Sequence, residues 1–251
     1  MLNIISHGSI REINLARAPV NALNLGLLQA LRAALEESVT AGAHGVVLSG
    51  APGLFSAGVD IPALMACDRE GVRTFWKELF AVCAAMARSP IPLVAAVTGH
   101  SPAGGAVLAL FCDYRVMAHG AFKIGLNEVQ VGLTVPECIQ FALRRVVGNH
   151  RAERLLVAGA MLESSAALDC GFVDELVDVD HVVARSISWM EELLTFPQHA
   201  MRATRALARA DLANVFADPD ALPLDAFTDA FLHPDTQFVL QQWMAARQKK
   251  H

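Results

Sequence analysis

The sequence predicts an α/β fold in which a sheet with covering helices is followed by a helical region. Three observations predict it. Short apolar runs, such as residues 45–50 and 93–97, have the length and composition of buried strands. Amphipathic stretches long enough to form helices lie between these runs. After about Glu137 the pattern favours helices only. Alternation of strands with helices is typical of a sheet covered by helices.

The first half of the chain alternates between the two kinds of element. Residues 1–5 and 10–15 predict a hairpin that turns at His7-Gly8-Ser9. Leucines then recur every four residues, which predicts a helix that starts near Asn24 and ends by Gly42. The further predicted elements are strands over 45–50, 93–97 and 114–118 and helices over 69–88 and 104–110.

The second half is predicted to be helical throughout, without a repeat, a low-complexity tract or a flexible linker. The candidate helices cover residues 137–147, 151–158, 164–169, 181–194, 200–210 and 234–247. We expect residues 1–195 to form the core and residues 196–251 to form a helical appendage that is not an independent domain.

Composition narrows the class of protein. Hydrophobic residues make up 54% of the 251 residues and charged residues 18%, an excess that we expect to be buried between subunits as well as in a core. No apolar run approaches the roughly 18 to 20 residues that span a bilayer. The N-terminus lacks the pattern of a signal peptide, so we expect a cytoplasmic protein. The formal net charge of −5 gives no general attraction to nucleic acid or membrane.

The cysteines and histidines do not have metal-ligand spacing. Five cysteines are widely spaced without a CxxC pair, which indicates buried thiols in a reducing compartment. Nine histidines show no metal-binding pattern, so we predict no metal. The basic tail at residues 247–251, which includes Lys249 and Lys250, is either solvated or in contact with a phosphate of a nucleotide-bearing ligand.

Two glycine-bearing loops follow two successive predicted strands. The first, Phe-Ser-Ala-Gly-Val-Asp at residues 55–60, leads into a predicted helix start, where free N–H groups and the helix dipole favour negative charge. It is either an oxyanion site using the Val59 N–H or a simple turn capped by Asp60. The second, residues 99–105, has paired glycines that either admit a ligand or pack a helix closely on a strand. Two donors that converge on one oxygen would stabilise an enolate.

One glutamate follows these loops. Glu128 lies in the segment Phe-Lys-Ile-Gly-Leu-Asn-Glu-Val-Gln-Val-Gly at residues 122–132. A carboxylate beside two oxyanion-type loops indicates proton movement next to a thioester. We expect burial among its apolar neighbours to raise the pKa of Glu128 toward neutrality. These neighbours are Ile124, Leu126, Val129 and Val131.

These motifs resemble the enoyl-CoA hydratase/isomerase family, also called the crotonase family, over essentially the whole chain. The resemblance is carried by residues 21–23, 55–60, 102–105 and 112–115. Residues 101–105 and 124–132 are most similar to mitochondrial-type Δ3,Δ2-enoyl-CoA isomerases. The resemblance implies a ClpP/crotonase-like spiral of ββα units with a helical C-terminal region. It also implies trimers or dimers of trimers, an acyl-CoA substrate and no separate cofactor.

The same resemblance implies roles for individual residues. The Val59 and Gly104 N–H groups would form the oxyanion hole for the thioester carbonyl, and Glu128 would be the catalytic carboxylate. Asn127 falls where the isomerases contact substrate. The CoA site would be lined by Ser56, Ala57, Gly58, Val59 and Asp60, with the Ala57 backbone near the adenine.

The number of carboxylates separates two reactions. The resemblance implies that hydratases use two glutamates, one of which would stand at Val107, where a valine cannot exchange protons. Each acid–base group contributes roughly 10²–10⁴ in rate, so the sequence predicts a 3-enoyl-CoA to 2-enoyl-CoA isomerase of fatty-acid β-oxidation. The alternatives are an enoyl-CoA hydratase, another reaction such as thioester hydrolysis, or a CoA-binding module without turnover.

Other residues receive structural interpretations. The serine in Gly-His-Ser-Pro-Ala at residues 99–103 does not fit a nucleophile elbow, which ends in glycine. His100 is interpreted as a polar loop residue that could face the acyl pocket. Asp113 is expected to hydrogen-bond at a strand start, and Glu137 to begin a helix. Trp76, with Phe80, either packs in the core or borders the acyl pocket.

Overall fold

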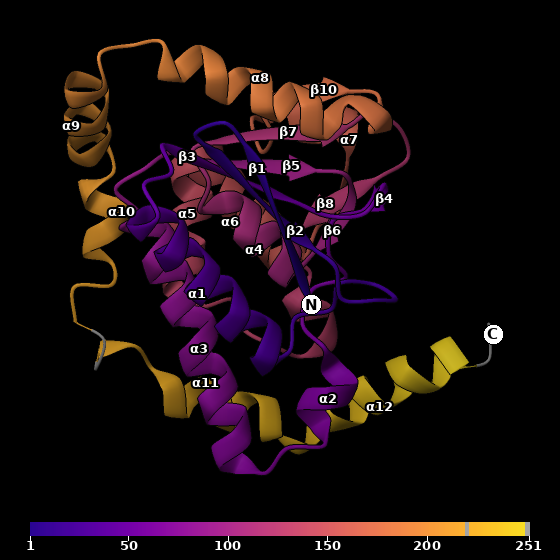
Figure 1. The fold of residues 1–251 in the computed structure, drawn as a ribbon. Coiled ribbons are helices and arrows are strands. Elements are labelled where there is room, and N and C mark those ends of the chain that lie inside the picture. The colour runs from indigo at the N-terminus through magenta and orange to yellow at the C-terminus, as the bar shows by residue number, and fades with distance from the viewer. Residues whose placement is uncertain (219–220, 249–251) are drawn as a thin grey trace.

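A six-stranded sheet forms the centre of the computed structural model, which describes residues 1–218 and 221–248. Its strand order is β1-β2-β3-β5-β7-β10 (Figure 1). The first two strands pair antiparallel, and every later pairing is parallel. The strands are β1 (Leu2–His7), β2 (Ile10–Leu15), β3 (Gly45–Ser49), β5 (Leu93–Val97), β7 (Tyr114–Ala118) and β10 (Glu175–Val177).

A second, smaller sheet has the order β4-β6-β8-β9 and consists of strands of two to four residues. Its first three strands each follow a long strand of the main sheet along the chain and precede a helix. This order of long strand, short strand and helix is repeated three times. The strands are β4 (Gly53–Leu54), β6 (Gly99–Pro102), β8 (Lys123–Gly125) and β9 (Leu162–Glu163).

Helices account for the rest of the regular structure. The first of them begins after Asn24, whose side chain accepts a hydrogen bond from the Leu27 N–H at 2.9 Å, as the leucine periodicity predicted. The core contributes α1 (Leu25–Thr40), α2 (Ile61–Met65), α3 (Arg69–Ala87), α4 (Gly104–Leu110), η1 (Glu128–Val131), α5 (Glu137–Val147), α6 (Asn149–Ala158), α7 (Ser164–Asp169), η2 (Val179–His181) and α8 (Val182–Leu194). The C-terminal region contributes α9 (Gln198–Ala208), α10 (Ala210–Asn214), α11 (Leu224–Leu232) and α12 (Pro234–Gln248).

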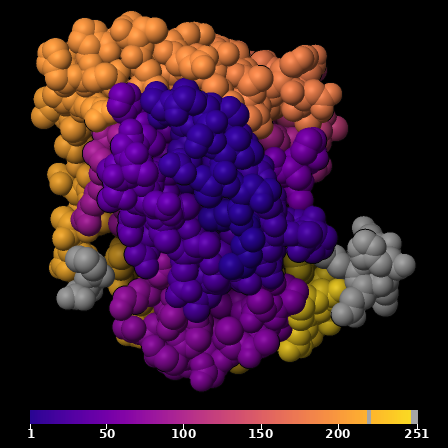
Figure 2. Space-filling view, viewed as in Figure 1, coloured from indigo at the N-terminus to yellow at the C-terminus, as the bar shows by residue number. Residues whose placement is uncertain are grey.

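The main sheet is covered on both faces. On β3, Val47 points toward α8 and packs in one cluster with Met190, whereas Val46 and Leu48 point to the larger core formed with α1, α3 and α4. Burial on both faces explains why the central strands read as continuous apolar runs. Figure 2 shows the indigo and purple N-terminal segments filling the near face, with α8 and α9 in orange along its upper and left edges.

The prediction that only helices follow Glu137 was wrong. Strands β9 and β10 lie in that half, and β10 completes the main sheet by pairing in parallel with β7. Three residues are too few to show a strand period against a helical background. Residues 200–210 were predicted as one helix, but the chain bends at Arg209 (φ −109°, ψ 7°) between α9 and α10. Helix α11 was not predicted.

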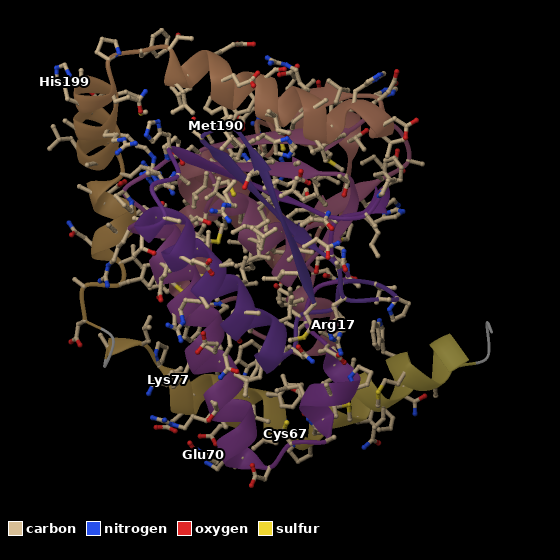
Figure 3. The ribbon with its side chains drawn as sticks, in the orientation of Figure 1. Arg17, Cys67, Glu70, Lys77, Met190 and His199 are labelled. Atoms are coloured by element: carbon tan, nitrogen blue, oxygen red, sulfur yellow. The ribbon has the colours of Figure 1, made fainter. Side chains whose placement is uncertain are left out.

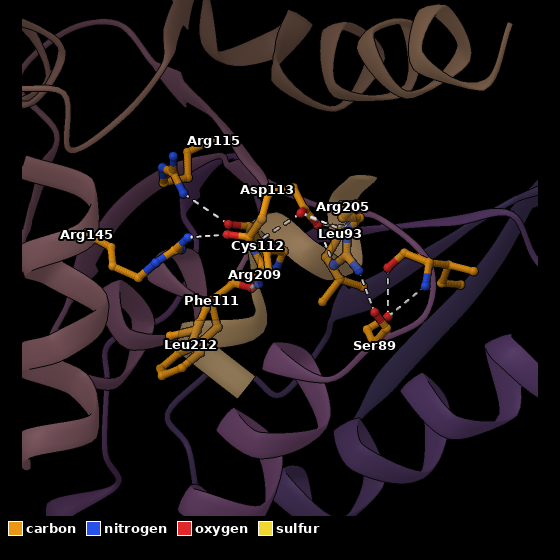
Figure 4. A network of polar contacts seen from close by, with 12 residues as sticks. Ser89, Leu93, Phe111, Cys112, Asp113, Arg115, Arg145, Arg205, Arg209 and Leu212 are labelled. Carbon is orange, nitrogen blue, oxygen red and sulfur yellow. Dashed lines mark hydrogen bonds and ion pairs between the residues drawn. The ribbon is translucent and has the colours of Figure 1, made fainter. Parts of the chain in front are cut away.

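The C-terminal helices run along the outside of the core (Figure 1). Helix α9 is tied to the core through Asp113, whose carboxylate accepts two hydrogen bonds of 2.8 Å from Arg205 and one of 2.7 Å from the Leu93 N–H (Figure 4). Helix α11 then packs against α3, and α12 against η1. Lys249 and Lys250 lie outside the described residues. Within those residues, no helix is both long and apolar enough to cross a membrane.

Candidate active site

A cavity of about 110 Å³ lies where the loops after β4 and β6 meet the turn η1. Its wall is mainly apolar, as is usual for a ligand site. The lining residues come from both glycine-bearing loops, from η1 and the residues on either side of it, and from α2, α3, α4, α5, α11 and α12. They are Ala57, Val59, Ile61, Trp76, Leu79, Pro102, Ala103, Gly104, Val107, Asn127, Glu128, Val131, Leu133, Thr134, Pro136, Ile139, Phe227 and Trp243.

The two glycine-bearing loops touch each other at the cavity wall. Gly58 has φ +80°, a conformation that L side chains rarely adopt, and a Cβ at this position would lie 2.9 Å from the Pro102 carbonyl oxygen. A Cβ built on Gly104 would lie 3.4 Å from the Val59 nitrogen. The amide groups of Val59 and Gly104 are therefore neighbours, although they are 45 positions apart in the sequence.

Both amide groups are candidate donors to a ligand. Among the described residues, neither the Val59 N–H nor the Gly104 N–H donates to a loop or turn carbonyl. Between the loops and α4, Ala103 has φ +46° and ψ −117°, an unusual conformation for a residue with a side chain, and its own N–H donates to the Gly125 carbonyl at 2.8 Å. Strained backbone of this kind is concentrated at functional sites. Two adjacent free donors can bind one oxyanion.

Two side chains of the first loop serve the fold and do not line the cavity. The Ser56 hydroxyl donates to the Asn21 carbonyl at 2.7 Å and accepts from the Gly58 N–H at 3.1 Å. Asp60 caps α2 by accepting from the Ala63 N–H and pairs with Arg17 at 2.7 Å; Figure 3 shows Arg17 near α2. Ser56 and Asp60 therefore hold the loop in place, and the wall carries Ala57 and Val59.

Glu128 places a carboxylate in this apolar wall. Glu128 is the first residue of η1. Its Oε2 atom is buried without a hydrogen-bond partner in the part of the chain that the structure describes. Burial raises the pKa of the Glu128 carboxyl to about 7 from an ordinary value of 4.5. A hydrogen bond to its own backbone opposes this only in part. The group can therefore both accept and release a proton near neutral pH.

The neighbours of Glu128 were predicted only in part. Ile124 and Leu126 are buried and Val131 lines the cavity, but Val129 is 41% exposed, so its predicted place around the carboxylate was wrong. The 3₁₀ geometry of η1 turns successive side chains by about a third of a turn, which directs Val129 away from Glu128. Asn127 precedes the turn and lines the cavity beside it.

Comparison with known proteins decides the family. A family model described as enoyl-CoA hydratase/isomerase matches residues 6–250. The chain belongs to this family. It has the crotonase fold, because its structure superposes on a crystal structure of human mitochondrial Δ3-Δ2-enoyl-CoA isomerase with a TM-score of 0.94. That superposition covers 99% of this chain and 98% of the other at 28% identity.

Relatives of the hydratase/isomerase family carry two kinds of name. Mouse mitochondrial enoyl-CoA delta isomerase 1 is 32% identical over 244 residues, which cover 96% of this chain and 84% of the relative. A probable enoyl-CoA hydratase of Mycobacterium avium (strain 104) is 32% identical over 213 residues, which cover 81% of this chain and 80% of the relative. The names of these relatives therefore do not decide between isomerisation and hydration.

Residue 107 is an apolar part of the cavity wall in this member of the hydratase/isomerase family. Val107 lies on α4, three residues after Gly104, and is 1% exposed. It lines the cavity together with Glu128. Among the described residues of the lining, Glu128 is the only one with a titratable side chain.

The C-terminal region contributes two residues to the cavity wall, neither of which the sequence singled out. Phe227 of α11 and Trp243 of α12 line the cavity, as does Trp76 of α3, whose ring centroid lies 6.5 Å from that of Phe227. Sequence reasoning had left open whether Trp76 bordered a pocket. His100 does not line the cavity: it is exposed and its ring stacks edge-on with Phe122.

Proposed function

We propose that this protein is a Δ3,Δ2-enoyl-CoA isomerase, which moves the double bond of a 3-enoyl thioester to the 2 position. The observation that carries the proposal is the chemistry of the cavity lining. Within the described residues of the lining, one carboxylate, that of Glu128, shares the cavity with two backbone N–H groups that have no loop or turn acceptor, and Val107 would stand where hydration needs a second acid. A single group that both takes and returns a proton suffices for isomerisation and not for hydration.

The reaction would proceed through a dienolate. The Glu128 carboxylate removes a proton from C2 of the 3-enoyl thioester, and the electrons move onto the thioester oxygen. The Val59 and Gly104 N–H groups hold that oxygen while it carries negative charge. The protonated Glu128 then delivers the proton to C4, which leaves the double bond between C2 and C3. The carboxylate is regenerated without the entry of water.

The acid–base properties of Glu128 support both transfers. With a pKa of about 7, the carboxyl group exists in both protonation states near neutral pH. An ordinary glutamate would be a weak base and, once protonated, a strong acid that releases its proton to water. Burial beside Val131 and Leu133 therefore prepares the group for each half of the reaction.

The substrate would lie across the two loops. We propose that the acyl chain enters the wall formed by Trp76, Phe227 and Trp243, and that Asn127 contacts the substrate beside the carboxylate. The Ser56–Gly58 backbone would face the CoA moiety, with Ala57 near the adenine. The Ser56 and Asp60 side chains would support this site indirectly, through the bonds that hold the loop.

The biological setting is proposed on the same basis. An isomerase of this kind would act in fatty-acid β-oxidation, with CoA as part of the substrate and without a separate cofactor. A homotrimer or a dimer of trimers fits the high apolar content of 54%. A reducing, cytoplasmic compartment fits the five cysteines, all of which are free thiols.

The direct test uses purified protein with two substrates in separate assays. With 3-enoyl-CoA, we expect rapid appearance of the conjugated 2-enoyl thioester. With 2-enoyl-CoA, we expect little loss of the conjugated thioester to a 3-hydroxy product. Hydration at a rate that competes with isomerisation would overturn the proposal in favour of the hydratase. Absence of turnover across acyl chain lengths would favour a CoA-binding module.

A further inference from the structure

We propose that Thr236, on the C-terminal helix α12, is a positioning residue for Glu128. This inference rests on the proposed function, in which Glu128 carries the proton. Thr236 does not line the cavity and would not touch the substrate. It acts on the backbone of the turn that carries the carboxylate.

The position of the Glu128 carboxylate depends on its backbone. No other side chain in the described part of the structure hydrogen-bonds to it, and its Oε2 atom has no partner at all there. The turn itself is held by the Leu133 N–H, which donates to the Glu128 carbonyl at 3.0 Å. Whatever fixes the end of this turn therefore fixes the carboxylate.

Gly132 is the end of the turn, and Thr236 holds it. Gly132 adopts a left-handed conformation with φ +80° and closes η1 by donating to the Glu128 and Val129 carbonyls. The Thr236 hydroxyl donates to the Gly132 carbonyl at 3.0 Å, and Thr236 is only 4% exposed. A Cβ on Gly132 would lie 3.2 Å from the Thr236 Cα, so the helix and the turn are in close backbone contact.

A second side chain holds the opposite side of the turn. The Gln130 side-chain amide donates to the Gly159 carbonyl, at the end of α6, at 2.9 Å. The turn is thus fixed between the core and the C-terminal cover. The Gln130 bond belongs to the core, and the Thr236 bond links the catalytic turn to the cover.

The same helix reaches the substrate cavity. Trp243 lies seven residues after Thr236, two turns further along α12, and lines the cavity. Helix α12 therefore contacts the turn that carries Glu128 at its first turn and the acyl site further along. Packing of α12 against the core would therefore complete the apolar cavity wall through Trp243 and also position the Glu128 carboxylate through Thr236.

The kinetic test compares Thr236→Val, which keeps the shape and removes the hydroxyl, with Thr236→Ser, which keeps the hydroxyl. The control is Thr228→Val on the neighbouring helix α11, where a buried hydroxyl donates only to the Leu224 carbonyl of its own helix. Displacement of a reacting group by about 1 Å lowers the reaction rate on the order of 100-fold. We expect Thr236→Val to lower kcat about 10- to 100-fold with little change in KM, and both other variants to stay within about threefold of the parent protein.

An unchanged kcat for Thr236→Val would overturn the inference, as would equal losses for Thr236→Val and Thr228→Val. If Thr236→Val fails to fold, Thr236→Ala replaces it in the same comparison with Thr236→Ser. A second readout does not depend on the reaction: amide hydrogen exchange at residues 128–133 should be about 2- to 10-fold faster in Thr236→Val than in Thr236→Ser. Equal exchange would sink the positioning role even if the protein is an isomerase. Faster exchange without isomerase activity would instead count against the proposed function alone.

Discussion

Val107 and Glu128 line the same cavity from two different elements, Val107 from α4 and Glu128 from η1. The valine is 1% exposed and belongs to the hydrophobic core. The wall that holds one carboxylate therefore has an apolar side chain where a second acid would meet the same substrate. This relationship leads to the proposal of proton transfer without the addition of water.

A second carboxylate at position 107 should introduce hydration. Val107→Glu would place a second acid in the cavity that holds Glu128, and we expect faster hydration of 2-enoyl-CoA than with the parent protein. Two acids close together also repel when both are ionised, so the pair would titrate jointly. The matched control is Val107→Gln, which has the same shape and no acid. Equal hydration rates for the two variants would show that position 107 does not select the reaction.

The pH dependence of the reaction should report the raised pKa of Glu128. The ionised carboxylate removes the first proton, and burial raises its pKa to about 7. We expect kcat/KM for isomerisation to rise about tenfold per pH unit below this value and to level off above it. The measurement is a profile from about pH 5.5 to 9. A flat profile between about pH 5.5 and 7.5 would instead indicate a glutamate with its ordinary pKa.

The same raised pKa should make Glu128 costly for stability at neutral pH. In the unfolded chain Glu128 titrates near 4.5, and in the folded protein near 7. Between these pH values the folded state binds the Glu128 proton more tightly than the unfolded chain does. The stabilisation that this proton gives the folded state is therefore fully present below about pH 4.5 and is lost as the pH rises to 7. The loss of stability amounts to at most about 3.5 kcal/mol, at about 1.4 kcal/mol per pKa unit.

Glu128→Gln removes this dependence because glutamine does not titrate. Its free energy of unfolding should therefore exceed that of the parent protein at about pH 8 and approach it at about pH 5. Denaturant unfolding at the two pH values measures the difference. A constant difference between the two proteins at both pH values would contradict the raised pKa.

The docking of the C-terminal helices should depend on Asp113. This carboxylate meets Arg205 at 2.8 Å and Arg209 at 3.2 Å, and all three side chains are at most 14% exposed. Asp113→Asn would leave two nearly buried guanidinium groups without their counter-charge, and we expect a loss of about 3–5 kcal/mol in urea unfolding. The control is Glu192→Gln, which removes an exposed partner of Arg185 and should cost less than about 1 kcal/mol. Equal effects would show that the buried network does not hold α9.

The long elements could be predicted because their periods extend over many residues. The helix after Asn24 and the strand at residues 93–97 have patterns that local physics determines. The sheet edge could not be predicted in the same way, because β10 has three residues and gains its hydrogen bonds from β7, far away in the sequence. The cover helix α11 was missed because it is stabilised by packing on α3.

The parts of the candidate site that could be predicted are those with a distinctive residue type in the sequence. Gly104 and Glu128 line the cavity, and Gly58 packs against the loop that leads to Gly104. Capping by Asp60 was one of two interpretations of its loop, and the structure shows this cap. The hydrogen bond of Ser56 to Asn21 and the ion pair of Asp60 with Arg17 could not be predicted, because these partners lie in a loop 35 and 43 positions earlier. Thr236 gave no signal, since its partner is a backbone carbonyl that only the folded chain brings near.

The isomerisation rate of Glu128→Gln tests the central claim most directly. Glutamine keeps the size of the side chain and cannot carry a proton, so the change isolates the chemistry from the packing. With 3-enoyl-CoA as substrate, and with folding of the variant checked by circular dichroism, kcat should fall about 10²- to 10⁴-fold. A rate equal to that of the parent protein would contradict the assignment of Glu128 as the group that moves the proton from C2 to C4.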